Sequence, residues 1–275
     1  MDWMFNIDLF VLRRSMRWLA LALVCLFAIG TSTLTIAQEL QIYTEDWPPV
    51  SFGNGNKVDG MAVEMVQALQ VRINNTQAIQ LVPWARGYKA LLEEPNVLLF
   101  TVGRSEEREK LMVLLGPLAI STTALYTRKG NAANLQLLGD DIQKLTVGAY
   151  RSSIFADTAR KKGFTRIEQA GSPQVIATML MAKRFDLWVE GSLVVASVMK
   201  DIGHSVDEIE KVKVLDSLEL YLAFSTPTSA ATIKLWEDAL RAMKKDGSFA
   251  RIHQKWLPHE TPPLQVIRLN PPGKF

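Results

Sequence analysis

The chain has 275 residues, of which 48% are hydrophobic and 21% charged, and its formal net charge is only +3. This composition is that of a globular protein with one large domain or two of ordinary size, and it excludes a disordered or collagen-like chain. The small positive excess gives no support for nucleic-acid binding. Because the chain has a single cysteine, it has neither an internal disulfide framework nor a cysteine-rich metal site.

The N-terminus has the pattern of a secretory signal peptide. Arginines precede an apolar run at 18–29, and a stretch of small and polar residues follows at 30–37. The small residues at its end fit a signal-peptidase site, which predicts cleavage after Ala37. A permanent membrane anchor is the alternative, because the uncharged stretch is just long enough to span a bilayer. The polar residues after the apolar run favour the signal peptide, since they are poor membrane material.

The remaining chain alternates short strands with amphipathic helices. The first half predicts strands and helices in turn, at 40–44, 61–73, 79–82, 83–92 and 97–102. After a turn near residue 130, the alternation restarts at 145–149, 152–162, 173–182, 185–189, 193–200 and 212–215. Such β-α-β order argues for open α/β sheets with right-handed crossovers.

Two half-size α/β units are expected, joined by two crossing strands at 122–128 and 218–225. The long helix at 229–245 and the short helix at 249–256 would then return to the first unit, and the proline-rich tail would lie extended on its surface. The expected division is a signal peptide at 1–37, lobe one at 38–127 and 222–275, and lobe two at 128–221. Ligands in such folds bind at the carboxyl ends of strands, in the cleft between the lobes.

Catalytic motifs are not found. The histidines are His204, His253 and His259, and the sequence has no nucleophile elbow, phosphate-binding loop, dinucleotide fingerprint or zinc-protease motif. The acidic pairs at 93–94 and 106–107 have the pattern of solvated surface carboxylates. A binding function is therefore better supported than an enzymatic one, and no cofactor or metal is expected.

Aromatic and basic residues follow the first two strands. Trp47 stands on a proline-stiffened loop, where its ring could form a flat wall for a ligand or fill the core of lobe one. Trp84 and Arg86 open the next helix. Trp84 could pack in the core or line the cleft, and Arg86 could bind an anion or lie on the surface.

The third strand ends in a group of polar and basic residues. Thr101 and Gly103 could direct a hydroxyl and a backbone N–H into the cleft, and Arg104 and Arg108 stand near the next helix start. A guanidinium there can hold a carboxylate through two parallel hydrogen bonds. Surface pairing of these arginines with nearby glutamates is the alternative.

In lobe two, Ser152 and Ser153 follow a strand and open a helix. Serine hydroxyls and free amides at a helix N-terminus can bind an anion, but they also serve as ordinary helix caps. The two roles are compatible.

Landmarks in this order resemble the periplasmic solute-binding proteins of the polar amino-acid transport type, partners of ABC importers (bacterial extracellular solute-binding protein family 3). The resemblance covers residues 38–257 and rests on segments spread along the chain: Trp47–Phe52, Gly60–Met65, Pro83–Arg86, Ser105–Glu109, Gly116–Pro117, Leu145–Gly148, Arg184–Trp188, Lys245–Ser248 and Lys255–Trp256. It implies a two-lobed α/β fold, the type II periplasmic-binding-protein fold, with two open mixed sheets that close on a small ligand.

The resemblance also implies roles for single residues. Trp47 matches the aromatic residue that covers the ligand, and Arg108 matches the arginine that grips the α-carboxylate. Thr101 and Gly103 match the hydroxyl and amide that flank this carboxylate. Ser152 and Ser153 match the amide and hydroxyl donors of lobe two.

One position departs from the family pattern. Where amino-acid binders carry an aspartate for the ligand ammonium, this chain has Gly191. The adjacent Glu190 is expected to point to the other face of its strand. Glu45 or Asp46 could serve instead, and Arg86 in the cleft would favour a second acidic group on the ligand. An organic anion or a short peptide therefore stays open beside an amino acid.

The leading hypothesis is a monomeric periplasmic protein that captures a small polar solute bearing a carboxylate and delivers it to an ABC permease. A dehydratase-like enzyme on the same fold, or a sensor module whose closed form signals to a membrane partner, are the alternatives.

Overall fold

The computed structural model of this protein describes residues 39–258 and 260–271. The expected signal peptide and its cleavage after Ala37 lie outside the described residues. These described residues form one compact unit. Among the described residues, no helix is both long and apolar enough to cross a bilayer.

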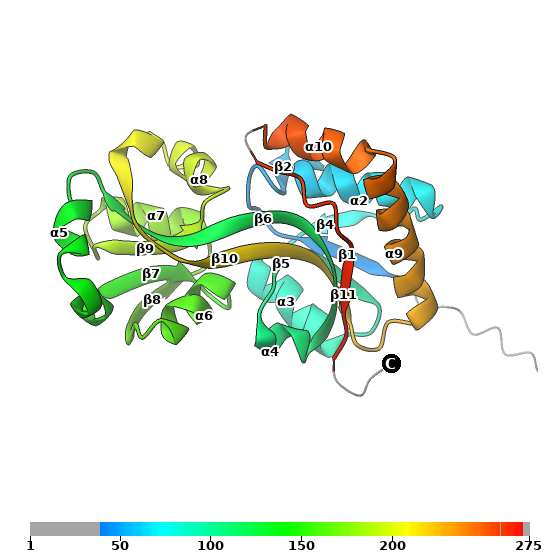
Figure 1. The fold of residues 1–275 in the computed structure, drawn as a ribbon, viewed down its shortest axis with the longest axis horizontal. Helices are drawn as coiled ribbons and strands as arrows, with labels where there is room; N and C mark the ends of the chain where they lie inside the picture. Colours follow the sequence, from blue (N-terminus) through cyan, green and yellow to red (C-terminus); the bar gives the residue numbers. More distant parts are fainter. Residues whose placement is uncertain (1–38, 259, 272–275) are drawn as a thin grey trace, which may run out of the picture. The chain divides into compact units, whose positions relative to one another are not determined.

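Two groups of elements gather at the two ends of a pair of long strands, β6 and β10 (Figure 1). We call the group around β1, β4 and β5 lobe one, and the group around β7, β8 and β9 lobe two. Because β10 pairs with β5 of lobe one, β6 pairs with β9 of lobe two, and β6 and β10 pair with each other, the hydrogen bonding is continuous along the order β4-β1-β5-β10-β6-β9-β7-β8.

Lobe one begins with a parallel sheet and its covering helices. Its N-terminal elements are β1 (Gln41–Thr44), β2 (Phe52–Asn54), β3 (Lys57–Asp59), α2 (Met61–Arg72), β4 (Ile79–Leu81), α3 (Trp84–Glu93), β5 (Val97–Gly103) and α4 (Glu106–Glu109). Strand β1 pairs in parallel with β4 and β5. All seven residues of β5 are buried, as expected of a parallel strand that is covered on both faces.

The two crossing strands are β6 (Met112–Arg128) and β10 (Ile209–Ser225), each of 17 residues. They run antiparallel to each other along their whole length. Both end at the residues expected from the sequence but begin well before them, and β10 includes the separate strand expected at 212–215. The Gly116–Pro117 pair obscures the start of β6, and exposed lysines and polar residues obscure the continuity of β10.

Lobe two holds a second parallel sheet. Its elements are α5 (Ala132–Gln136), the 3₁₀ helix η1 (Gly139–Lys144), β7 (Thr146–Tyr150), α6 (Ile154–Lys161), β8 (Arg166–Ala170), α7 (Pro173–Met181), β9 (Leu187–Gly191), α8 (Val195–Asp201) and the 3₁₀ helix η2 (Val206–Glu208). Strand β7 pairs in parallel with β8 and β9. Strand β9 begins and ends two residues later than predicted, so Glu190 and Gly191 lie within it.

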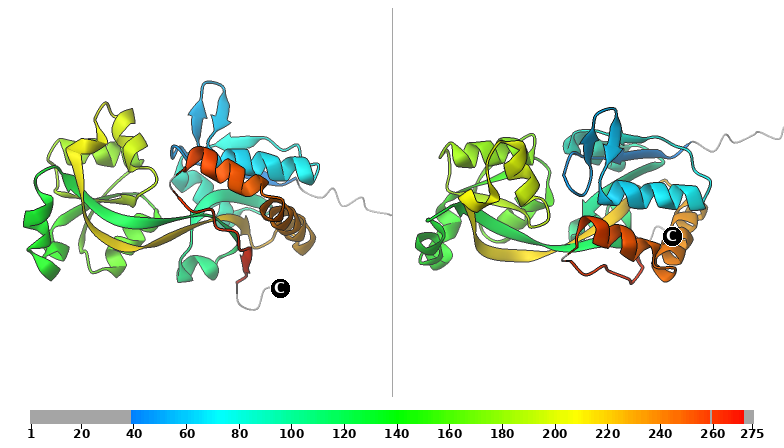
Figure 2. Two further views of the ribbon diagram at one scale, coloured as in Figure 1. Left: turned by 45° about the horizontal axis from the view of Figure 1, so that its top comes forward. Right: turned by 90° about the horizontal axis from the view of Figure 1, so that it is seen from above.

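The chain returns to lobe one at its C-terminus through α9 (Ala230–Lys245) and α10 (Ser248–Trp256), which pack with α2 (Figure 2). The tail was expected to be extended on the surface. It contributes a short strand, β11 (Ile267–Leu269), which pairs with β6 beside Gly116.

Serine side chains fix several helix starts. The hydroxyls of Ser153, Ser172 and Ser229 accept hydrogen bonds from the backbone N–H three residues on, and they cap α6, α7 and α9. Each such cap satisfies a donor that the helix itself leaves free. The start of α6 places its first turn beside the cleft.

Candidate functional site

The carboxyl ends of β1, β5 and β7 meet at one buried cavity between the lobes. Residues from all three strand ends line it, together with Arg108 and apolar groups: Glu45, Trp47, Trp84, Thr101, Gly103, Arg108, Tyr150, Ile154, Phe155, Leu218 and Leu220. Only about 10 Å³ of free space remains inside, roughly the room of one water molecule. The lobes are therefore closed on each other in this structure.

Arg108 is the central charge of this cavity, and its side chain is 2% exposed. Nη1 donates to the carbonyl oxygen of Gly103 at 2.9 Å, and Nη2 donates to that of Ser152 at 3.3 Å. Nε has no hydrogen-bond partner among the described residues. No carboxylate of the described residues forms a direct ion pair with this guanidinium, and the nearest acidic group of the cavity is the buried Glu45.

Two aromatic rings hold the guanidinium of Arg108 in place. Its carbon Cζ lies 5.3 Å from the ring centre of Trp84 and 5.0 Å from that of Tyr88. The two rings are stacked on each other, with their centres 5.4 Å apart. Such cation–π contacts orient the charge without neutralising it.

The backbone of Ser152 joins the lobes at this point. Its carbonyl oxygen accepts a hydrogen bond from the indole Nε1 of Trp84 at 2.8 Å, besides the bond from Arg108. A lobe-two carbonyl thus occupies the donors of two lobe-one side chains. These donors are the ones that a bound oxyanion would use.

Glu45 is the acidic group of the cavity and is 5% exposed. Its Oε1 accepts a hydrogen bond of 3.3 Å from the hydroxyl of Tyr150. Burial raises the pKa of Glu45 to about 8, although Tyr150 and Arg108 both favour its charged form. At neutral pH this carboxyl is therefore largely protonated.

Position 191 has no room for an acidic side chain. A Cβ atom at Gly191 would lie 3.1 Å from Cζ2 of Trp47 and 3.2 Å from Cζ of Phe155. Glu190 does not line the cavity. It is fully buried, one of its oxygens accepts from the N–H of Gly191 at 2.9 Å, and burial raises its pKa well above the usual value.

Strained backbone marks two of the predicted site residues. Thr101 has φ of 69° and Ser152 has φ of 58°, both in the left-handed region. This conformation is uncommon for residues other than glycine, and for a β-branched threonine it is a clear outlier. Strain of this kind persists where the surrounding structure enforces it, and it clusters at functional sites.

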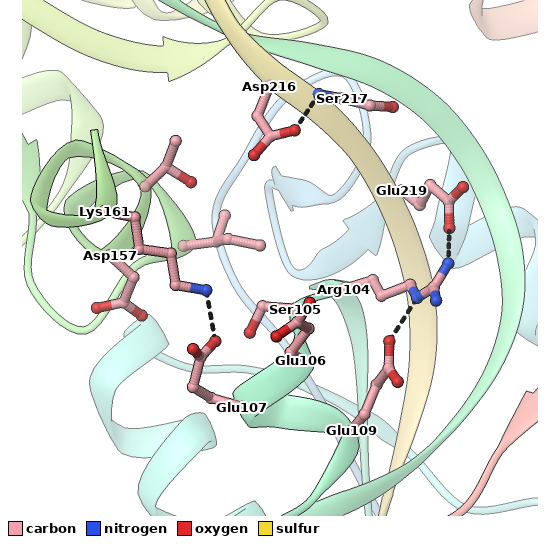
Figure 3. A pocket seen from close by; sticks show the side chains of 12 residues that line it. Arg104, Ser105, Glu106, Glu107, Glu109, Asp157, Lys161, Asp216, Ser217 and Glu219 are labelled. Carbon is pink, nitrogen blue, oxygen red and sulfur yellow. Dashed lines mark hydrogen bonds and ion pairs between the residues drawn. The ribbon is translucent and has the colours of Figure 1, made fainter.

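A larger hollow of about 500 Å³ lies beside the cavity, between α4 and α6 (Figure 3). Its charges are mostly paired: Arg104 contacts Glu109 at 2.7 Å and Glu219 at 3.2 Å, and Lys161 contacts Glu107 at 2.6 Å. The last pair joins the two lobes and lowers the pKa of Glu107 to about 2. Arg104 is thus a surface ion-pair partner.

The sequence model of the bacterial extracellular solute-binding proteins, family 3, matches residues 40–259 of this chain. The chain belongs to this family. A search among curated proteins finds no match.

Solved structures share the fold of this family 3 protein at low sequence identity. A histidine kinase sensor domain similar to periplasmic binding proteins is 19% identical with a TM-score of 0.69, covering 81% of this chain and 98% of its own. The arginine-, lysine-, histidine-binding protein ArtJ of Geobacillus stearothermophilus is 16% identical with a TM-score of 0.68, over 81% and 96%. The substrate-binding protein of an amino acid ABC transporter is 15% identical with a TM-score of 0.65, over 80% and 100%. The expected two-lobed periplasmic-binding-protein fold is confirmed.

Most of the predicted site residues of this family 3 protein come together. The structure brings Glu45, Trp47, Trp84, Thr101, Gly103 and Arg108 to one cavity and places the carbonyl group of Ser152 beside Arg108. Arg86, by contrast, is exposed, and the described residues provide it with no side-chain hydrogen bond or ion pair. Ser153 is buried, but its hydroxyl caps α6 and donates to the carbonyl of Tyr150 at 2.6 Å.

Sequence reasoning missed Tyr150, Tyr88 and Phe155. Tyr150 ends β7 directly before the two serines, so the rule that ligands bind at strand ends could have identified it. Tyr88 lies one turn after Trp84 on α3, a spacing typical of side chains on the same helix face. Phe155 had no such signal. In residues 39–258 and 260–271, no three metal-ligating side chains come together.

Proposed function

We propose that this protein captures a small polar solute bearing a carboxylate in the cavity between its lobes. The buried, unpaired guanidinium of Arg108 carries the proposal. A charge in a closed, water-poor cavity is costly without a partner, and a ligand carboxylate would supply that partner. The rings of Trp84 and Tyr88 already hold the fork of donors in a fixed plane.

Ligand binding would replace hydrogen bonds that now join the lobes with hydrogen bonds to the ligand. The donors of Trp84 and Arg108 that bind the carbonyl of Ser152 are suited to the two oxygens of a carboxylate. With about 10 Å³ of free space, the cavity must widen to admit even a small solute. We therefore infer an open form in which these contacts are broken and a liganded form in which the solute bridges the lobes.

A cationic group on the ligand would meet Glu45. Gly191 leaves no acidic side chain at the position that the family uses for the ammonium, and Trp47 and Phe155 fill the nearby space. Glu45 lines the same cavity as Arg108, and its Oε2 accepts no hydrogen bond from the described residues. A zwitterion therefore fits better than a simple anion.

We further propose delivery of this solute to an ABC importer by a monomeric protein that is exported to the periplasm through its signal peptide. The family membership of the chain and the arginine-led apolar run at its N-terminus support this role. Loss of solute uptake on deletion of the gene would test it. Unchanged uptake with loss of a transcriptional response to the solute would favour a sensor. We propose no catalytic step and no cofactor.

A thermal-shift panel on residues 38–275 tests the capture of a carboxylate. The panel holds the twenty L-amino acids, succinate, 4-aminobutanoate and, without a carboxylate, ethylamine and 1,5-diaminopentane. A ligand at a hundred times its Kd should add about 2.7 kcal/mol to the free energy of unfolding. Stabilisation by carboxylates and not by the amines is expected. Stabilisation by the amines alone would contradict the proposal.

A further inference from the structure

A second hollow of about 380 Å³ lies on another side of the buried cavity. Its lobe-one wall includes Leu81, Pro83 and Trp84, and its lobe-two wall is formed by the turn before α7 and the first residues of that helix. Glu45 and Trp84 line both this outer hollow and the buried cavity. The two spaces therefore adjoin at these two side chains.

The outer hollow is acidic and apolar. Glu45 and Asp46 both line it, and no lysine or arginine does. Its remaining walls are chiefly apolar, with Leu81 itself 37% exposed to solvent. A group that suits these walls carries a positive charge on an apolar stem, because the stem can cover the apolar walls while its charged end meets the carboxylates.

The N-terminus of α7 offers little to a competing anion. Pro173 has no backbone N–H, and the hydroxyl of Ser172 already accepts from the N–H of Val175 at 3.4 Å. An anion would therefore find no N–H at Pro173 and no free hydroxyl at Ser172, although such donors are what makes a helix start an anion site. The carboxylate of Asp46 gives the hollow its negative charge, and Glu45 adds to it once a cation beside it favours its ionised form.

Glu45 supplies a second, independent sign of a ligand. It is a buried carboxyl whose only hydrogen bond comes from Tyr150, and its Oε2 has no hydrogen-bond partner in the described residues. A buried carboxyl on the boundary between two spaces is a costly feature unless a ligand passes it.

We infer that the outer hollow is the second half of the ligand site and that the ligand is longer than a single α-amino acid. Its carboxylate would lie at Arg108, its apolar stem would pass Trp84, and its cationic end would lie in the outer hollow, whose acidic residues are Glu45 and Asp46. This inference rests on the proposed capture of a carboxylate. The ligand class is a zwitterion whose two charges are separated by an apolar stem, such as an ω-amino carboxylate or a short peptide.

A series of ω-amino carboxylates from 4-aminobutanoate to 8-aminooctanoate tests the inference by calorimetric titration. Each methylene group removed from water should tighten binding about threefold to fourfold until the hollow is filled. We expect 8-aminooctanoate to bind at least tenfold tighter than 4-aminobutanoate. Octanoate, which lacks the amine, should bind more weakly than 8-aminooctanoate.

Two variants locate the effect. Gly171 lines the hollow, its φ is not in the left-handed region, and a Cβ there would meet no atom within 4 Å, so Gly171→Trp can fill the space without backbone strain. This change should reduce the affinity for 8-aminooctanoate to that for 4-aminobutanoate and leave the latter unchanged. Asp46→Asn should weaken the binding of 8-aminooctanoate about fivefold. The matched control Asp140→Asn, at an exposed carboxylate outside the hollow, should have no effect.

The outcomes separate the two proposals. Equal affinity across the series would overturn the assignment of the outer hollow to the ligand site, and so would tight binding of 8-aminooctanoate by Gly171→Trp. The capture of a carboxylate would stand in either case if Arg108→Ala still abolishes the binding of 4-aminobutanoate. Absence of binding by every compound in the series overturns both the inference and the capture of a carboxylate.

Discussion

The hydroxyl of Tyr150, at the end of β7 in lobe two, donates to Oε1 of Glu45, in the loop after β1 in lobe one, across 3.3 Å. This bond ties the protonation of a buried carboxyl to the closure of the lobes. Burial raises the pKa of both groups, that of Glu45 to about 8. Closure without a ligand therefore leaves Glu45 mostly neutral at pH 7, and a cationic ligand beside it would favour ionisation.

Proton release is the first expected consequence. A zwitterion whose cationic group lies beside Glu45 lowers the pKa of this carboxyl, so the complex holds fewer protons than the free protein below pH 8. Affinity should then rise with pH up to about 8, by at most tenfold per pH unit for one proton. Calorimetry of 6-aminohexanoate in buffers of different ionisation enthalpy measures the release. Glu45→Gln should remove it, and an unchanged release in that variant would exclude Glu45 as the source.

Position 191 should not accept a side chain without cost. A Cβ at Gly191 would crowd Trp47 and Phe155 at 3.1–3.2 Å, so Gly191→Ala should lower the free energy of unfolding by about 1–3 kcal/mol. Gly171→Ala is the matched control, because a Cβ there meets nothing within 4 Å, and it should be close to neutral. Urea denaturation of both variants decides this. Equal stability of the two variants would show that the side chains of Trp47 and Phe155 move to accommodate the added methyl group at little cost.

The adjacent serines at the start of α6 should respond in opposite directions. Ser152→Gly relieves a left-handed residue and keeps the carbonyl that binds Trp84 and Arg108, so it should be neutral or stabilising by up to about 1 kcal/mol. Ser153→Ala removes a helix cap and should cost about 1 kcal/mol. Denaturant titrations compare them. A destabilised Ser152→Gly would mean that the hydroxyl of Ser152, not its backbone, matters to the fold.

The burial of Lys244 should make the free energy of unfolding depend on pH above neutrality. Its Nζ donates to the carbonyl oxygens of Pro117 and Gln265, both at 2.7 Å, and burial lowers its pKa to about 7. Between pH 7 and its ordinary value near 10.5, the unfolded chain binds a proton that the folded chain does not. The contribution of Lys244 to the free energy of unfolding should therefore rise with pH in this window and be least favourable below pH 7.

Lys244→Met provides the comparison. The difference in unfolding free energy between the wild type and this variant should change in favour of the wild type as the pH rises from 7 to about 10. A difference that stays constant over this range would show that Lys244 titrates normally in the folded protein.

The strand ends of the fold could be predicted from the sequence, and with them most of the site. The apolar run of β5 and the turn signals around it placed Thr101, Gly103 and Arg108 together. Strand β8 could not be predicted, because most of its residues are exposed and charged or polar, and β11 is too short and too close to prolines to show a pattern.

Side-chain direction was harder to predict than position. Arg86 and Arg108 are both arginines close to aromatic residues in the sequence, but only Arg108 lies between lobe-one rings and a lobe-two carbonyl. Ser152 was expected to offer a donor to the ligand, but its carbonyl oxygen accepts hydrogen bonds from Trp84 and Arg108. Both outcomes depend on how the lobes meet, which no local pattern of residues specifies.

The central claim is that Arg108 binds the carboxylate of the solute, and one titration tests it most directly. Wild-type protein and Arg108→Ala are titrated in the calorimeter with the compound that stabilises the wild type most in the thermal-shift panel and with its carboxamide analogue. We predict that the wild type loses about 2–5 kcal/mol of binding free energy when the carboxylate becomes an amide, that Arg108→Ala loses as much for the carboxylate itself, and that Arg108→Lys recovers little. The thermal unfolding of Arg108→Ala should remain cooperative, because the guanidinium supports no ion pair among the described residues. Equal affinity of a folded Arg108→Ala variant and the wild type for the carboxylate would contradict the account.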